Sequence, residues 1–135
     1  MKAILITALT LSIAFLAGCK TPVAIDPLTG QEQTAAYQAG YFYAPLEADI
    51  GEVFKAAIVE LDDLGYFRTG ELHKDNHITI YARKVGDEKV TVRAFYPSDS
   101  SKLPEGAKSM LRIRIGKMGN LAESQVVYAR VRDAL

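Results

Sequence analysis

Three segments of the chain alternate between apolar and polar residues, and this pattern constrains the fold more than any other feature. The segments are residues 77–83, 89–96 and 110–115. Successive side chains of a β-strand point to opposite faces, so each segment predicts a strand with one apolar and one polar face. Gly86-Asp87 predicts a tight hairpin turn between the first two. We therefore expect an antiparallel sheet that buries only one of its faces.

Two amphipathic helices are expected to cover that apolar face. Asp49 predicts the N-cap of the first helix, with Glu52 as its capping-box partner, and Gly65 lies where its C-terminal cap is expected. Asn120 predicts the N-cap of the second, with Glu123 at the third position. Apolar residues recur at helical spacing in both. They are Ile50, Val53, Phe54, Ala57, Ile58, Leu61 and Leu64 in the first helix, and Leu121, Val127, Tyr128, Val131 and Leu135 in the second.

Two further strands are predicted. Residues 41–44 are rich in aromatic side chains, residues 66–74 form a strand weakened by Gly70, and residues 97–109 form a long loop. The predicted order is β-α-β-β-β-β-α. The fold class is α+β: a two-layer sandwich in which an antiparallel sheet of four to five strands carries two helices on one face.

The N-terminus has the pattern of an export signal. Met1-Lys2 precedes an apolar run from Ala3 to Ala17, which is shorter than the roughly 20 residues of a membrane span. Leu16-Ala17-Gly18-Cys19 resembles the bacterial lipobox, in which the cysteine carries acyl chains such as palmitate and becomes the first residue after cleavage. Cys19 is the only cysteine, so neither a disulfide nor a cysteine-based metal site is expected. We predict a lipid anchor at Cys19.

The chain is expected to have three parts: a lipoprotein signal peptide over residues 1–18, a lipidated Cys19 with a flexible tether over residues 19–40, and one α+β domain over residues 41–135. The tether contains Pro22, Pro27 and Gly30 and shows no apolar period. A flexible stretch of this length would span roughly 25 Å. An edge strand beginning at Ala35 is the alternative for its last residues.

Residues 41–135 resemble a family of small bacterial lipoproteins called domain of unknown function 3568. The resemblance rests on the lipobox, the tyrosine-containing strand, the helix from Val53 to Gly65 and the run Ile113-Arg-Ile-Gly116-Lys-Met-Gly119-Asn120 before the last helix. Asn120 stands where Asp is expected, and the 97–109 loop is longer than usual. The family has no assigned reaction, so the resemblance implies no catalytic residue. In Gram-negative lipoproteins Asp after the lipidated Cys favours the inner membrane; Lys20 instead implies the periplasmic face of the outer membrane.

Few residues suggest catalysis. His73 and His77 are four residues apart. On one strand they would be separated by roughly 13 Å, which is too far to share a metal ion. A tight turn at Asp75-Asn76 would bring them closer and is the alternative that allows a metal site. The serines of the long loop lack a nucleophile-elbow motif; they are Ser98, Ser100, Ser101 and Ser109. Gly116-Lys-Met-Gly119 precedes a helix and is a weak candidate for anion binding, because such glycines usually serve the turn. We name no catalytic, cofactor-binding or metal-binding residue.

The polar face of the sheet is the best candidate for a partner site. Its four arginines, with two aromatic residues between them, concentrate positive charge on one face. The chain as a whole has no net charge, with 16 Lys and Arg and 16 Asp and Glu. A solvated face without a partner is the simpler alternative, since Thr, Arg and Tyr are common on strands. The possible partner face comprises Tyr81, Arg83, Arg93, Phe95, Arg112 and Arg114, with Thr79 and Thr91 beside them. Such a face could meet an acidic partner protein, the anionic groups of peptidoglycan or lipid headgroups, and the sequence does not choose among them.

We therefore expect a lipid-anchored protein of the bacterial envelope that acts as a non-enzymatic binding or scaffold module. Its predicted partners are the membrane, through Cys19, and an envelope protein or peptidoglycan. The charge balance argues against nucleic acid. The alternative is a small cell-wall-acting or metal-dependent hydrolase, which would require a deep pocket with converging polar side chains.

Overall fold

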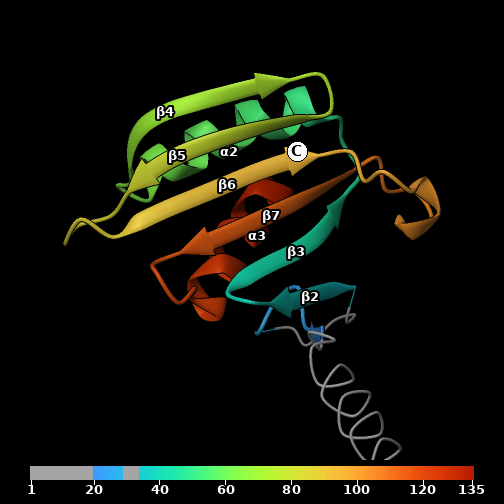
Figure 1. The fold of residues 1–135 in the computed structure, drawn as a ribbon, viewed down its shortest axis with the longest axis horizontal. Helices are drawn as coiled ribbons and strands as arrows, with labels where there is room; N and C mark the ends of the chain where they lie inside the picture. Colours follow the sequence, from blue (N-terminus) through green and yellow to red (C-terminus); the bar gives the residue numbers. More distant parts are fainter. Residues whose placement is uncertain (1–19, 29–33) are drawn as a thin grey trace, which may run out of the picture.

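Seven antiparallel strands form one sheet, in the order β1-β2-β3-β7-β6-β5-β4 (Figure 1). The computed structural model describes residues 20–28 and 34–135. The predicted signal peptide, residues 1–18, and Cys19 lie outside the described residues. The strands are β1 (Thr21–Val23), β2 (Ala35–Gln38), β3 (Tyr41–Leu46), β4 (Phe67–Lys74), β5 (His77–Arg83), β6 (Lys89–Phe95) and β7 (Ser109–Ile115).

Both helices pack on the same face of this sheet, as predicted. They are α2 (Ile50–Asp63) and α3 (Leu121–Asp133), and they lie behind the strands in the view of Figure 1. Their apolar sides and the inward side chains of the strands form one core. The fully buried residues include Phe42, Val53, Leu61, Ile113 and Val131. The α+β class and the two-layer arrangement are therefore confirmed.

The predicted helix ends are also confirmed. Asp49 and Glu52 form the capping box of α2, and Gly65 follows the helix with a φ of +78°. The Asn120 side chain accepts a hydrogen bond from the Glu123 backbone N–H at the start of α3. One apolar residue was assigned wrongly, because Leu135 lies beyond the end of α3 and is 50% exposed.

The predicted order β-α-β-β-β-β-α is found from β3 to α3, but two further strands precede it. The sheet has seven strands rather than four to five, because β1 and β2 lie within the stretch predicted as a tether. The alternative is correct in that a strand begins at Ala35, but this strand, β2, lies between β1 and β3, and β1 forms the edge of the sheet. Ala35 is buried, Val23 and Tyr37 pack against the core, and Gln125 of α3 donates a hydrogen bond to the Ala24 carbonyl at 2.7 Å. Strands of three and four residues are too short to show a recognisable alternation, so distant contacts define them.

The long loop contains a short 3₁₀ helix, η1 (Ser100–Lys102). The Asp99 side chain caps it by accepting hydrogen bonds from the backbone N–H and the hydroxyl of Ser101. The chain then enters β7, which lies in the middle of the sheet between β3 and β6. The residues of β7 thus face neighbours from distant parts of the sequence.

Candidate functional site

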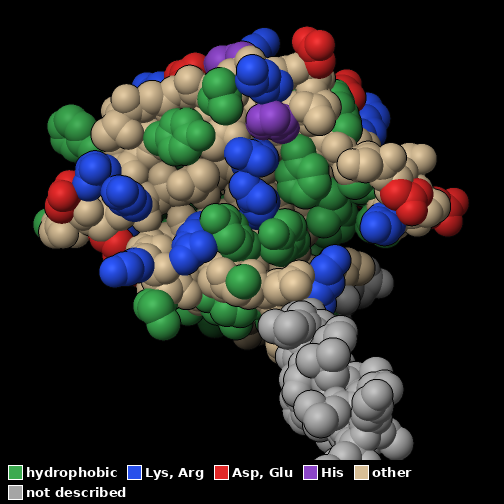
Figure 2. Space-filling view, in the orientation of Figure 1, with side chains coloured by type: hydrophobic (Ala, Val, Ile, Leu, Met, Phe, Trp, Pro, Cys, Tyr) green, Lys and Arg blue, Asp and Glu red, His purple; other side chains and the backbone are tan. Residues whose placement is uncertain are grey.

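The sheet face opposite the helices carries a concentration of positive charge. The strand pairing places six Lys and Arg on this face, and none of the described strand positions on it is Asp or Glu. The cationic residues are Lys74, Arg83, Lys89, Arg93, Arg112 and Arg114. Figure 2 looks onto this open face: Lys and Arg side chains occupy its middle, and acidic side chains appear at its rim.

Three arginines form the centre of the open face. Arg93 on β6 lies directly opposite Arg112 on β7, and Arg114 follows on the same side of β7. The guanidinium carbons of Arg112 and Arg114 each lie 4.7 Å from the ring centroid of Tyr41 on β3. We call Arg93, Arg112, Arg114 and Tyr41 the arginine cluster. Stacking on the electron-rich ring offsets part of the repulsion between the two cations above it.

Within the part of the chain that the structure describes, no carboxylate pairs with these three arginines. Arg93 donates instead to the Thr79 hydroxyl at 2.8 Å, and Arg114 donates to the Lys117 carbonyl. The Arg112 Nε is buried and has no hydrogen-bond partner among the described residues. Buried N–H groups are usually satisfied. The cluster thus has unused capacity to bind an anion.

The other predicted face residues lie around this cluster. Tyr81 is 40% exposed, and Phe95 is half-buried on β6. Arg83 also lies on the open face but pairs with Asp87 of the hairpin turn at 2.6 Å, so it does not join the unpaired arginines. Thr79 was predicted as a surface residue, but its exposure is 0%, because the Arg93 side chain lies against it.

Several further residues of the open face are not among those predicted from the sequence. Tyr41 belongs to the arginine cluster, Tyr43 and Met110 flank it, and Lys74 lies opposite His77 at the end of β4. The alternation of β7 already implied that Met110 shares a side with Arg112 and Arg114. The placement of β3 beside β7 had no such local signal, since these strands are more than 60 residues apart in the chain.

The positive charge acts on the one histidine of this face. Desolvation is the largest cause that lowers the pKa of His77, followed by the charges of Arg93, Lys74 and Arg112. The His77 Nδ1 lies 2.8 Å from the Asn76 side-chain oxygen. His77 is therefore a natural probe of the electrostatic potential of the open face.

Arg93→Gln is expected to raise the pKa of His77. Arg93 is the largest electrostatic cause of the lowered pKa, so its neutralisation leaves desolvation and the smaller effects of Lys74 and Arg112. Titration of the His77 ring signals by NMR measures the change. Arg112→Gln is the matched comparison and should raise the pKa less. A decrease in the His77 pKa in either variant would contradict the assigned origin of the shift.

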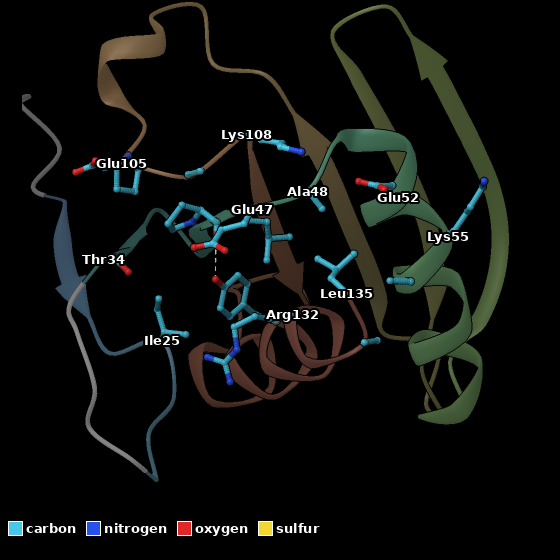
Figure 3. Close-up of a pocket in the computed structure, with 17 residues that line it drawn as sticks. Ile25, Thr34, Glu47, Ala48, Glu52, Lys55, Glu105, Lys108, Arg132 and Leu135 are labelled. Atoms are coloured by element: carbon cyan, nitrogen blue, oxygen red, sulfur yellow. Dashed lines mark hydrogen bonds between the residues drawn. The ribbon is translucent and has the colours of Figure 1, made fainter.

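An open hollow of about 1020 Å³ lies at the other side of the molecule, between the start of α2, the end of α3 and the loop before β7. It has three acidic and three basic residues in its lining. In Figure 3 these side chains are spread around the hollow, with Glu105 and Lys55 at opposite ends and Arg132 pointing away, and they do not converge on one point. The deep pocket with converging polar groups that a hydrolase would require is not seen in the described residues.

Tyr128 is the largest buried side chain beside the hollow. Its hydroxyl donates to the Pro45 carbonyl at 2.5 Å, and the dashed line in Figure 3 marks this bond. Burial raises the pKa of Tyr128 to about 12, so the hydroxyl stays protonated at neutral pH. The hydrogen bond ties α3 to β3, which is a structural role.

The two histidines do not form a metal site. A turn at Asp75-Asn76 does join β4 to β5, but the pairing of Lys74 with His77 puts His73 on the opposite sheet face from His77. His73 contacts Phe54 edge to face at 5.0 Å and lies 2.9 Å from Glu71. Over residues 20–28 and 34–135, no group of three or more His, Cys, Asp or Glu is placed to hold a metal ion.

Ser109 and the glycines before α3 have structural roles. Ser109 is buried and donates to the Ala48 carbonyl at 2.7 Å, which joins β7 to the start of α2. The glycines at 116 and 119 both have positive φ values and form the turn into α3. The start of that helix is already occupied by the Asn120 cap.

No described helix is long and apolar enough to cross a membrane. A search of curated proteins found no match to this chain. A scan of protein families found a match over residues 2–134, nearly the whole chain, to the family described as "Protein of unknown function (DUF3568)". The expected resemblance is thus confirmed over the α+β fold, and the chain belongs to the DUF3568 family.

Proposed function

We propose that this chain is a lipid-anchored protein of the bacterial envelope that binds an anionic envelope component through its open sheet face. The arginine cluster carries the proposal: three guanidinium groups share one face, none has a carboxylate partner among the described residues, and one buried Nε lacks an acceptor. Arginine forms paired hydrogen bonds with carboxylates and phosphates, so a ligand bearing these groups fits best.

The anchor and the location remain those inferred from the sequence. Cys19 would carry the lipid, residues 1–18 would be removed, and Lys20 at the next position favours the periplasmic face of the outer membrane. Acyl chains contribute about 0.8 kcal/mol per buried methylene, so several chains hold a protein firmly. A scaffold or binding role suits a permanently anchored domain with an open, charged face.

Cys19→Ala tests the anchor. The wild-type protein should incorporate labelled palmitate and have the mass of residues 19–135 with acyl chains attached. The variant should incorporate no palmitate and keep the mass of the precursor, because the residue that is acylated is missing. Ser12→Ala, inside the apolar run, should behave as the wild type. A Cys19→Ala protein with the wild-type mass and label would contradict the lipoprotein assignment.

Charge reversal tests the binding face. Arg93→Glu with Arg112→Glu should abolish recovery of the partner when the native protein is cross-linked and purified from membranes, because like charges then meet across the interface. Lys55→Glu with Lys102→Glu changes the net charge equally on exposed side chains outside this face and should leave recovery intact. Equal recovery with both double variants would show that the open face is not the binding site.

A further inference from the structure

The structure places the start of the sheet close to the proposed anchor. Thr21, the first residue of β1, follows Cys19 by only two positions, and β1 is the outermost strand of the sheet. Two residues span at most about 7 Å. A lipid on Cys19 would therefore hold this edge of the sheet near the bilayer, in place of the roughly 25 Å separation expected for a flexible tether.

The strand register aligns the same edge with the arginine cluster. Thr21 pairs with Tyr37, Tyr37 with Phe42, and Phe42 with Ile113. Ile113 lies between Arg112 and Arg114, whose side chains point to the open face. Neighbouring strands are about 4.8 Å apart, so β7 lies only about 14 Å from β1. The arginine cluster is thus at the level of Thr21 along the strands, and Thr21 follows the proposed anchor by two residues.

Charge decides which side of the domain would turn to an anionic surface. The open face carries six Lys and Arg at its strand positions and no described acid. The outer side of α2 carries four acidic residues and one lysine, and α3 has two of each sign. An anionic bilayer attracts the first side and repels the second.

The aromatic residues suit the same surface. Tyr41 and Tyr43 lie on the open side of β3, between the anchored edge and the arginines, with their rings 6.3 Å apart. Tyrosine is enriched at membrane interfaces because its ring is apolar and its hydroxyl is polar. Guanidinium groups match the phosphate oxygens of lipid headgroups in geometry and charge.

We propose that the open sheet face docks onto the anionic phospholipid headgroups of the membrane that holds the Cys19 lipid. Arg93, Arg112 and Arg114 contact lipid phosphates, and Tyr41 and Tyr43 lie at the headgroup level. The domain then lies flat on the bilayer with its helices facing away from the lipid. This inference rests on the proposed lipid anchor and names the anionic component that the open face binds.

A single introduced cysteine makes the orientation measurable, because the natural cysteine would be acylated. Met110→Cys places a fluorescent label on the open face, and Val59→Cys places one on the outer side of α2, where the side chain is 55% exposed. Full-length lipidated protein, with acylation verified by mass, is reconstituted into phosphatidylcholine vesicles with or without phosphatidylglycerol. Headgroup-attached nitroxide lipids then quench the labels according to their distance from the surface.

The expected result is strong quenching at position 110 and weak quenching at position 59 in phosphatidylglycerol vesicles. Each positive charge near an anionic surface strengthens the attraction about fivefold, so Arg112→Gln with Arg114→Gln should weaken docking about 25-fold. Lys55→Gln with Lys102→Gln should leave it unchanged. High salt should release the open face from the bilayer, since the screening length of electrostatic attraction falls from about 10 Å at 0.1 M salt to about 3 Å at 1 M.

Equal quenching at both positions, or no response to phosphatidylglycerol, would overturn the docking proposal. If the protein is acylated but does not dock, the lipid anchor stands, the docking proposal fails, and the cross-linking experiment with the charge-reversed variants decides whether the open face binds another anionic partner. If its mass shows no acyl chain, the proposed function and the docking proposal both fail. Thermal unfolding of each variant serves as the check that lost docking reflects lost charge rather than a damaged fold.

Discussion

Ile113→Ala is expected to lower the free energy of unfolding by about 2–5 kcal/mol. Ile113 lies at the centre of the sheet on β7, where it faces Phe42 on one side and Val92 on the other, and its exposed fraction is 0%. Removing its outer carbons leaves a cavity that a sheet held on both sides cannot close. Urea denaturation of a soluble form that begins at Lys20 measures the loss.

Arg112→Ala is the matched comparison, one residue away on the open face. Its side chain is half-buried and stacks on Tyr41, but it has no ion pair among the described residues and lies beside two other cations. Its removal should cost less than about 1 kcal/mol, which is the usual size of an exposed cation–π contact. Equal losses at positions 112 and 113 would contradict the assigned alternation of β7.

Gly119→Ala is expected to be the more damaging of two glycine substitutions. Gly119 has a φ of +80°, and a Cβ there would lie 2.2 Å from the Gly40 carbonyl oxygen and 2.5 Å from its Cα. The backbone of the turn between β2 and β3 thus contacts the turn before α3 directly. Left-handed backbone costs a non-glycine residue about 1–2 kcal/mol, and the overlap should add about 1–3 kcal/mol.

Gly86→Ala separates these two effects. Gly86 has a similar φ of +89°, but no atom would lie within 4 Å of its Cβ. This variant should therefore show the cost of the backbone conformation alone. The comparison uses the same soluble form and the same urea measurement. Equal stability of the two variants would show that the contact between Gly40 and Gly119 relaxes without cost.

The structure also changes which soluble form is appropriate for these measurements. A form that begins near Ala39, as the predicted domain boundary suggests, would lack β1 and β2. It would expose Phe42 and its neighbours on β3 at a new sheet edge and lose the contact of Gln125 with the Ala24 carbonyl. An unpaired edge strand invites association with other chains. A start at Lys20 keeps all seven strands.

The arginine cluster was only partly predictable. The alternation of β6 and β7 placed Arg93, Arg112 and Arg114 on one face, and the structure has them there. Arg83 is on the same face but is paired with Asp87, since the hairpin turn brings that carboxylate to within 2.6 Å. The stacking partner Tyr41 depends on β3 lying beside β7, which is a contact between distant segments.

The sequence by itself determined the features that depend on neighbouring residues. Period-two alternation defined β5, β6 and β7, helical spacing defined most of the apolar sides of α2 and α3, and Asp49 and Asn120 marked where these helices begin. These signals are local because side-chain direction and capping depend on residues a few positions apart. They were sufficient for the α+β class and for the side of the sheet that is buried.

Only the tertiary structure decided the features that depend on residues far apart in the chain. The short strands β1 and β2 form because β3 and α3 supply hydrogen bonds and apolar contacts to them. The residues of β1 and β2 show no local pattern that predicts these contacts. The separation of His73 from His77 follows from the strand register, and the position of β1 in line with Arg112 and Arg114 follows from three successive strand pairings. Register and strand order are set by packing across the whole sheet, so no local sequence pattern predicts them.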